Sequence, residues 1–131
     1  MYEIAKNLIN EQNFTAHLGV EIINCQLNQA LLKLPYESFL GEERINGGAI
    51  ASLIDLAATC AIWCHRSVTP KARGATIGLN INFMKLVRKS DIFALSTVKK
   101  RGSNISVAAV EVGSQNKENI AFATVTYKLN V

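Results

Sequence analysis

Residues 45–65 of the chain read INGGAIASLIDLAATCAIWCH. Asn46 is a common N-cap residue, and the two glycines after it open a run rich in Ala, Leu and Ile that is about 17 residues long. This composition and length predict a long helix. One ionisable residue, Asp55, interrupts the apolar run. A lone carboxylate is unfavourable to bury unless it is paired or functional.

The helix face that carries Asp55 is small and polar. At i, i+3 and i+4 spacing, the residues that share this face are Ala51, Ser52, Ala58 and Thr59. Most of the larger apolar residues fall on other faces, as expected of a core stripe. We therefore expect a substrate, a partner chain or another stretch of backbone to approach Asp55 closely. The simpler alternative is a carboxylate that accepts hydrogen bonds from a neighbouring loop.

Gly47 and Gly48 stand where a helix leaves its first backbone N–H groups without partners. Without side chains, they leave these donors open to an anion or a carbonyl oxygen, although a glycine pair before a helix can also be a plain turn. At about 1.5 Å per residue, Gly47 and Asp55 are roughly 12 Å apart along one helix. That is too far for both to contact one reacting carbonyl. If the two act together, they come from different subunits, which predicts a site at a homodimer interface.

The segment Asn46-Gly47-Gly48, followed by Asp55, resembles the motif of the PaaI-like hotdog-fold acyl-CoA thioesterases. In that family a His-Gly-Gly sequence is followed by a short apolar stretch and a catalytic Asp at the same spacing from the His as Asp55 has from Asn46. The resemblance extends over most of the chain, from about residue 19 to residue 131. It implies a hotdog fold, a catalytic role for Asp55, and an oxyanion site at the amide of Gly47, assisted by Gly48.

The chain departs from the family motif at two positions. Asn46 stands where the family has His, and Leu40 stands where the family commonly has an upstream Asn. The resemblance also implies that a hydroxyl residue early in a later strand helps to hold the attacking water, and Thr76 occupies that place. Asn46 and Thr76 therefore join Asp55 as candidate catalytic residues.

The expected function is hydrolysis of an acyl-CoA thioester to a carboxylic acid and free CoA. The Gly47 amide of one subunit would bind the thioester oxygen, and Asp55 of the other would act as general base or nucleophile. Residues at strand ends that could bind the substrate, the basic ones through CoA phosphates, are Lys85, Arg88, Arg101 and Ser103.

Two other functions stay open from the sequence. A non-catalytic acyl-CoA binding protein on the same fold is supported by the absence of the family His. Hydratase or dehydratase chemistry is less favoured, because it usually needs a His beside an acid and no His stands near the glycines.

Composition limits the remaining function classes. The 131 residues predict a single domain, residues 1–131, and 49% hydrophobic with 18% charged residues favours a folded core over disorder. No apolar run is long enough for a membrane span. Three cysteines, an odd number, argue against a disulfide framework and favour a reducing cytoplasm. No metal-ligand spacing is visible, so we expect neither a metal nor a cofactor.

The net charge of +4 would suit a nucleic acid, a membrane surface or a small anionic ligand. The basic clusters at 85–89 and 99–101 are not interleaved with aromatic residues, and no nucleic-acid-binding motif is visible. We therefore expect a small anionic ligand, the acyl-CoA, and neither a nucleic acid nor a membrane as partner.

The remaining periodicity predicts an antiparallel α+β protein. We expect a helix over 2–13 and strands over 19–27, 30–34, 75–84, 92–99, 105–112 and 120–129. Consecutive strands without intervening helices indicate an antiparallel sheet. Together with the resemblance, this predicts a sheet wrapped around the central helix, two copies of which join into a continuous sheet, with a dimer of dimers as a further option. Strict alternation in 75–84 places Thr76 on the face opposite Leu79 and Ile81.

Overall fold

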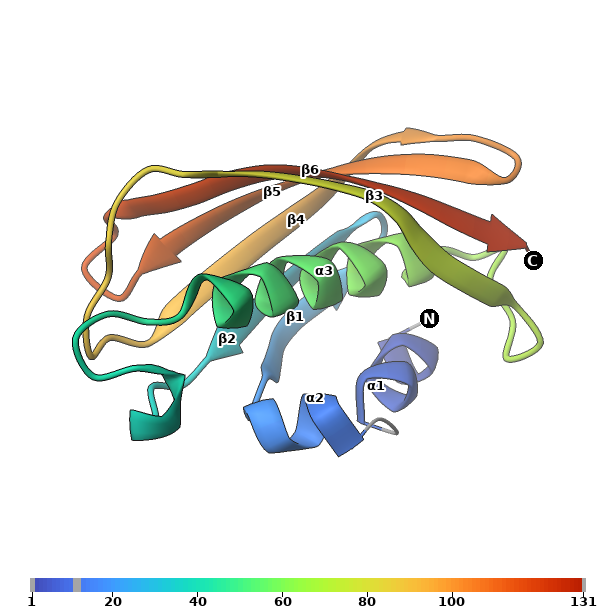
Figure 1. The fold of residues 1–131 in the computed structure, drawn as a ribbon. Helices are drawn as coiled ribbons and strands as arrows, with labels where there is room; N and C mark the ends of the chain where they lie inside the picture. The colour runs from blue at the N-terminus through green and yellow to red at the C-terminus, as the bar shows by residue number, and fades with distance from the viewer. Residues whose placement is uncertain (1, 11–12, 131) are drawn as a thin grey trace.

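The computed structural model describes residues 2–10 and 13–130. In chain order the elements are α1 (Tyr2–Asn10), α2 (Asn13–Leu18), β1 (Glu21–Gln26), β2 (Gln29–Leu34), the short 3-10 helix η1 (Ser38–Leu40), α3 (Gly47–Trp63), β3 (Arg73–Phe83), β4 (Ile92–Arg101), β5 (Ile105–Ser114) and β6 (Asn119–Asn130). Figure 1 shows α3 lying along the inner face of a curved sheet, with α1 and α2 on the opposite side of α3. The predicted long helix between two strands and four strands is confirmed.

The six strands form one antiparallel sheet in the order β1-β2-β4-β5-β6-β3. The chain leaves β2 near one edge, runs through α3 and returns as β3 at the opposite edge. This connection carries the helix across the sheet, so α3 becomes the centre of the core. It also leaves the outer side of β3 without a neighbouring strand in the described part of the chain.

The core lies between α3 and the inner face of the sheet. Leu53, Ile54, Ala57 and Ala61 are fully buried, and their spacing is that of one side of a helix. The alanines let the helix backbone approach the sheet closely, and each fully buried Leu or Ile contributes about 1.5–3 kcal/mol of transfer free energy. Because this side of α3 is fixed against the sheet, Asp55 on another side is aimed toward β3.

β3 contains an irregularity that the predicted alternation does not allow for. Thr76 pairs with Tyr127, and Gly78 pairs with Thr126, the next residue of β6, so Ile77 is an extra residue in a β-bulge. One inserted residue reverses the face of the side chains that precede it. Thr76 therefore lies on the helix side of the sheet together with Leu79, and the prediction that they lie on opposite faces is wrong.

The N-terminal region forms two helices. The predicted helix over 2–13 corresponds to α1, which spans Tyr2–Asn10. Residues 11 and 12 of the predicted helix lie outside the described residues. The turn of helix in α2 was not predicted; its buried residues, Thr15 and Leu18, are three apart and therefore lie on one face. The buried Ala5 and Ile9 of α1 likewise lie on one face of that helix. α1 thus packs on α3, and α2 packs on α1.

Three thiols gather where β1 meets the C-terminal end of α3. All three are free, and Sγ of Cys25 lies 3.5 Å from Sγ of Cys60. A hydrogen bond to Cys60 and burial raise the pKa of the Cys25 thiol, and burial raises the pKa of Cys64 to about 12. Burial also raises the pKa of the Tyr127 phenol, which Trp63 contacts through a hydrogen bond.

Alkaline pH is therefore expected to destabilise this fold. The unfolded chain loses thiol protons near pH 9.0 and phenol protons near pH 10.0, whereas the folded chain keeps them at Cys25, Cys64 and Tyr127. The stability that these groups contribute is present below those values and is lost as pH rises through them, because the unfolded state then binds fewer protons than the folded state. Thermal unfolding midpoints, measured in reductant from pH 8 to pH 11, should fall steadily. The fall should be shallower for Cys64→Ala; a level midpoint in the unmodified chain would contradict the prediction.

Candidate active site

Asp55 lies in the third turn of α3 and is half-buried. Its Oδ1 accepts a hydrogen bond of 2.5 Å from the Thr76 hydroxyl, which the bulge of β3 turns toward the helix. In the described residues this is the only hydrogen bond to the carboxylate, so its second oxygen is open to a water molecule or a substrate. Thr76 thus fixes the orientation of the carboxylate itself.

A cavity of about 200 Å³ opens beside this carboxylate. Its lining residues come from α1, α3, β3 and β6: Leu8, Ile9, Asp55, Leu56, Thr59, Gly74, Ala75, Thr76 and Tyr127. The Tyr127 ring is held in place from two sides. Trp63 Nε1 donates to its hydroxyl oxygen at 2.9 Å, and a Cβ at Gly74 would lie 2.5 Å from the ring. Glycine is therefore needed at position 74 for Tyr127 to form the floor of the cavity.

The N-terminus of α3 offers one open backbone donor. Asn46 caps the helix, and its Oδ1 accepts a 2.7 Å hydrogen bond from the Gly48 amide. The Gly48 amide is therefore occupied, which differs from the expectation that it assists the oxyanion site. The Gly47 amide has no acceptor within residues 2–10 and 13–130. The helix start therefore presents a single free N–H at its positive end.

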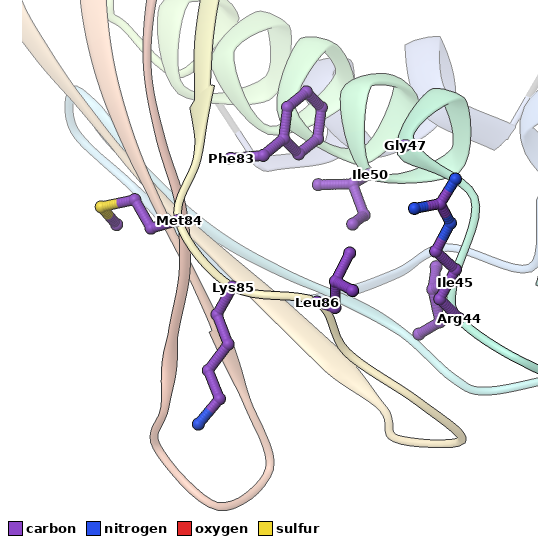
Figure 2. A pocket seen from close by; sticks show the side chains of 8 residues that line it. All are labelled: Arg44, Ile45, Gly47, Ile50, Phe83, Met84, Lys85 and Leu86. Atoms are coloured by element: carbon purple, nitrogen blue, oxygen red, sulfur yellow. The ribbon is translucent and has the colours of Figure 1, made fainter.

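A second cavity, of about 380 Å³, lies in front of Gly47 (Figure 2). Its lining residues are Arg44, Ile45, Gly47, Ile50, Phe83, Met84, Lys85 and Leu86. In Figure 2 the Arg44 side chain runs beside the first turn of α3, with its guanidinium next to Gly47. The cavity thus combines an apolar wall, a free amide and two cations, Arg44 and Lys85.

The four residues expected to bind the substrate do not lie together. Lys85 lines the Gly47 cavity and forms an ion pair with Glu118. Arg88 donates through Nε to the backbone oxygen of Glu42, and Ser103 lies exposed in the turn between β4 and β5.

Arg101 differs most from the expectation. Its guanidinium donates to Oδ1 of Asn28, at 3.0 and 2.8 Å, and to the carbonyl of Ile62, at 2.9 Å. It therefore stabilises the C-terminal end of α3, the opposite end from Gly47. Burial lowers the pKa of this guanidinium, which remains charged at neutral pH because an arginine titrates far above it.

Residues 43–121, which contain both Gly47 and Asp55, match the family model described as the thioesterase superfamily. The chain belongs to the thioesterase superfamily. A Halobacterium salinarum protein named for a proposed esterase activity is 31% identical over 117 residues, which cover 83% of this chain and 75% of the relative.

One further relative and one solved structure are similar to this thioesterase. The medium/long-chain acyl-CoA thioesterase YigI of Salmonella typhimurium is 30% identical, over 95% of this chain and 90% of the relative. The solved structure of the Escherichia coli PaaI protein, from the phenylacetic acid degradation operon, superposes with a TM-score of 0.87 at 17% identity, covering 97% of this chain and 91% of that one. The predicted hotdog fold and the assignment as a thioester hydrolase are confirmed.

Three residues of this thioesterase site escaped the sequence analysis as site residues. Thr59 lies one helical turn after Asp55 and lines the same cavity, a position that helical spacing alone brings beside the carboxylate. Tyr127 reaches the site only through the pairing of β6 with β3, and Arg44 only through the fold of the loop before α3. No local sequence pattern identifies the latter two.

Across residues 2–10 and 13–130, no helix is both long and apolar enough to cross a membrane. Over the same residues, no group of three or more His, Cys, Asp or Glu side chains is arranged to hold a metal ion.

Proposed function

We propose that this thioesterase hydrolyses acyl-CoA thioesters at a site shared by two identical chains. The observation that carries the proposal is the separation of two complementary half-sites. A carboxylate oriented by Thr76 lies in one cavity, and the free amide of Gly47 lies in another. Neither cavity contains both Asp55 and Gly47, and a thioester carbonyl needs an activating base and an oxyanion donor at once.

A two-fold axis would bring the half-sites together. Asp55 lies beside Thr76, and a Cβ at Gly47 would lie 3.6 Å from the Phe83 ring, so β3 runs antiparallel along α3. An axis near the middle of both elements would set Asp55 of one chain against Gly47 of its partner. Ala51, halfway between these two on α3, is small enough to let two helices approach.

The exposed side of β3 supports this dimer. Apolar side chains are exposed there in unusual number for an edge strand, with Ile77 at 57%, Phe83 at 53% and Leu86, just beyond the strand, at 72%. An unpaired edge also presents free backbone donors and acceptors. Pairing two copies of β3 would satisfy these groups and join the two sheets into one. A further association of two dimers into a tetramer stays a prediction.

The proposed reaction follows from the positions of the two groups. The thioester oxygen accepts a hydrogen bond from the Gly47 amide, where the helix N-terminus stabilises the negative charge that develops. Asp55 of the partner either removes a proton from the attacking water or attacks the carbonyl directly. The bond between the acyl carbon and sulfur breaks and CoA leaves; on the nucleophilic route, water then hydrolyses the acyl–Asp55 anhydride. On either route one water is added, its hydroxyl to the acyl carbon and its proton to the CoA sulfur.

The cations of the Gly47 cavity favour CoA as the leaving group. Arg44 and Lys85 border the cavity beside the proposed oxyanion donor, and CoA carries phosphates that arginine and lysine bind well. The acyl-CoA specificity of the Salmonella relative is consistent with this substrate class. The cytoplasmic location stays a prediction, and the three free thiols support it because they suit a reducing compartment.

Thiol release from acyl-CoA is the direct test. A panel of short-, medium- and long-chain acyl-CoAs and an aryl-CoA, followed with a thiol reagent, should give saturable release of free CoA from at least one class. Binding should be titrated by calorimetry with thioether analogues of the same acyl-CoAs, which have no thioester bond to hydrolyse. Saturable binding without thiol release would favour the non-catalytic binding protein instead, and would contradict the proposal.

A further inference from the structure

Two cavities lie in line beneath α1, starting from Asp55. The first is the cavity of about 200 Å³ that contains the carboxylate. The second, of about 340 Å³, is lined by Ile4, Asn7, Leu8, Trp63, Pro70, Ala72, Arg73 and Gly74. In Figure 1, α1 lies below the C-terminal half of α3, near the start of β3, which is where these residues meet. The two cavities thus lead from the carboxylate along α3 toward its C-terminal end.

Leu8 and Gly74 line both cavities, so they form the boundary between them. Gly74 cannot change its contribution, because even a Cβ at this position would collide with the Tyr127 ring. Leu8 is different: it is a half-buried side chain on α1, whose neighbour Ile9 anchors the helix in the core. Any passage between the two cavities would therefore have a width that depends on the size of the side chain at position 8.

The two parts of an acyl-CoA on either side of the thioester, the CoA arm and the acyl arm, need different surroundings. The CoA arm ends in phosphates and needs cations and an open exit, which the cavity at Gly47 offers through Arg44 and Lys85. Among the described residues that line the cavity at Asp55 there is no lysine or arginine, and α1 borders this cavity through Leu8 and Ile9. Part of its wall is apolar, formed by Leu8, Ile9 and Leu56, and suits a hydrocarbon chain. The rest of its lining is polar and includes Asp55, Thr59, Thr76 and Tyr127. When Asp55 and the partner's Gly47 meet at one carbonyl, each arm has its own cavity.

Resting on the proposed acyl-CoA thioesterase function, we propose that the acyl chain occupies the cavity beside Asp55 and that Leu8 sets the longest chain accepted. The cavity size gives a scale, since a cavity of about 150 Å³ accommodates one benzene molecule. The first cavity therefore holds roughly six to eight carbons. Longer chains must pass Leu8 to reach the second cavity. Arg73, the one basic side chain among its described lining residues, donates to the carbonyls of Lys71 and Ala72.

Substitutions at Leu8 should shift the chain-length profile in opposite directions. Saturated acyl-CoAs from butanoyl to tetradecanoyl would be compared by kcat/KM. Leu8→Ala opens the passage, so the optimum chain length should increase by about four carbons. The value of kcat/KM should rise by up to roughly fourfold for each further methylene that becomes buried. Leu8→Trp fills the first cavity, so the optimum should move to shorter chains and activity on decanoyl-CoA and longer substrates should fall at least tenfold.

The matched control is Asn10→Ala, an exposed position on the same helix that lines neither cavity; its profile should match the unmodified chain. Circular dichroism melts of all variants separate changes in profile from loss of folding. Profiles that stay superimposed for Leu8→Ala and Leu8→Trp overturn the proposal. So does a shift caused by Phe83→Ala, in the Gly47 cavity, or by Phe14→Ala, which lines an open apolar hollow beside Gly48.

Failure of the proposed function would look different from failure of this inference. If the unmodified chain releases no thiol from any acyl-CoA, the thioesterase function on this substrate class is wrong. If thiol is released, but the profile ignores position 8, only the placement of the acyl chain is wrong.

Discussion

Replacing Asp55 with asparagine is expected to lower kcat for acyl-CoA hydrolysis by about a thousandfold. The amide keeps the shape of the side chain and can still accept the hydrogen bond from Thr76, so the local structure should be preserved. It can neither take a proton from water nor attack as a carboxylate. KM should change little, because the substrate contacts of the two cavities remain.

Steady-state kinetics with the best substrate of the panel measures this effect. Glu111→Gln is the control, since it removes an exposed carboxylate on the outer face of β5. Thr76→Val should give a smaller loss, because the carboxylate stays and only its orientation is released. An Asp55→Asn variant with more than a tenth of the unmodified activity would remove Asp55 from the mechanism.

The sequence was sufficient for the parts of this structure that depend on local periodicity. α3 is evident from a long run of good helix formers behind an N-cap, and the face of Asp55 follows from helical spacing. The strands after it follow from alternation and turn residues, and their antiparallel pairing from the absence of intervening helices. The hydrogen bond that occupies the Gly48 amide could also be predicted from the sequence, because an N-cap side chain accepts from the second or third helical residue.

The parts that could not be predicted depend on contacts between distant segments. The bulge at Ile77 is a property of how β3 registers against β6, and it alone decides that Thr76 faces Asp55. Arg101 resembled a phosphate ligand because a basic residue at a strand end usually meets solvent. Instead, the packing of the β1–β2 turn brings Asn28 within its reach. Charge in a sequence does not reveal which neutral acceptors a fold will supply.

Replacing Gly47 with proline is expected to lower kcat/KM by about a hundredfold to a thousandfold, because it deletes a single N–H donor. Proline is favoured at the first position of a helix, where the missing N–H has no helical partner. Asn46 has φ −59° and ψ 132°, a conformation that a following proline requires. Gly47→Ala is the matched control: it retains the N–H, and its Cβ would make an ordinary 3.6 Å contact with Phe83.

The two inactive variants should restore activity when they are combined. If Asp55 and Gly47 act across a two-fold interface, a mixed dimer of Asp55→Asn and Gly47→Pro chains contains one site with both native groups and one site with both substitutions. Random assortment of equal amounts, by refolding the two variants together, should recover about a quarter of the unmodified activity. If both groups instead served one chain, no mixed dimer would contain an intact site, and the mixture would stay as inactive as its components. Recovery therefore tests the shared site independently of which acyl group is bound, and a lack of recovery in a mixture shown by mass spectrometry to contain mixed dimers would contradict it.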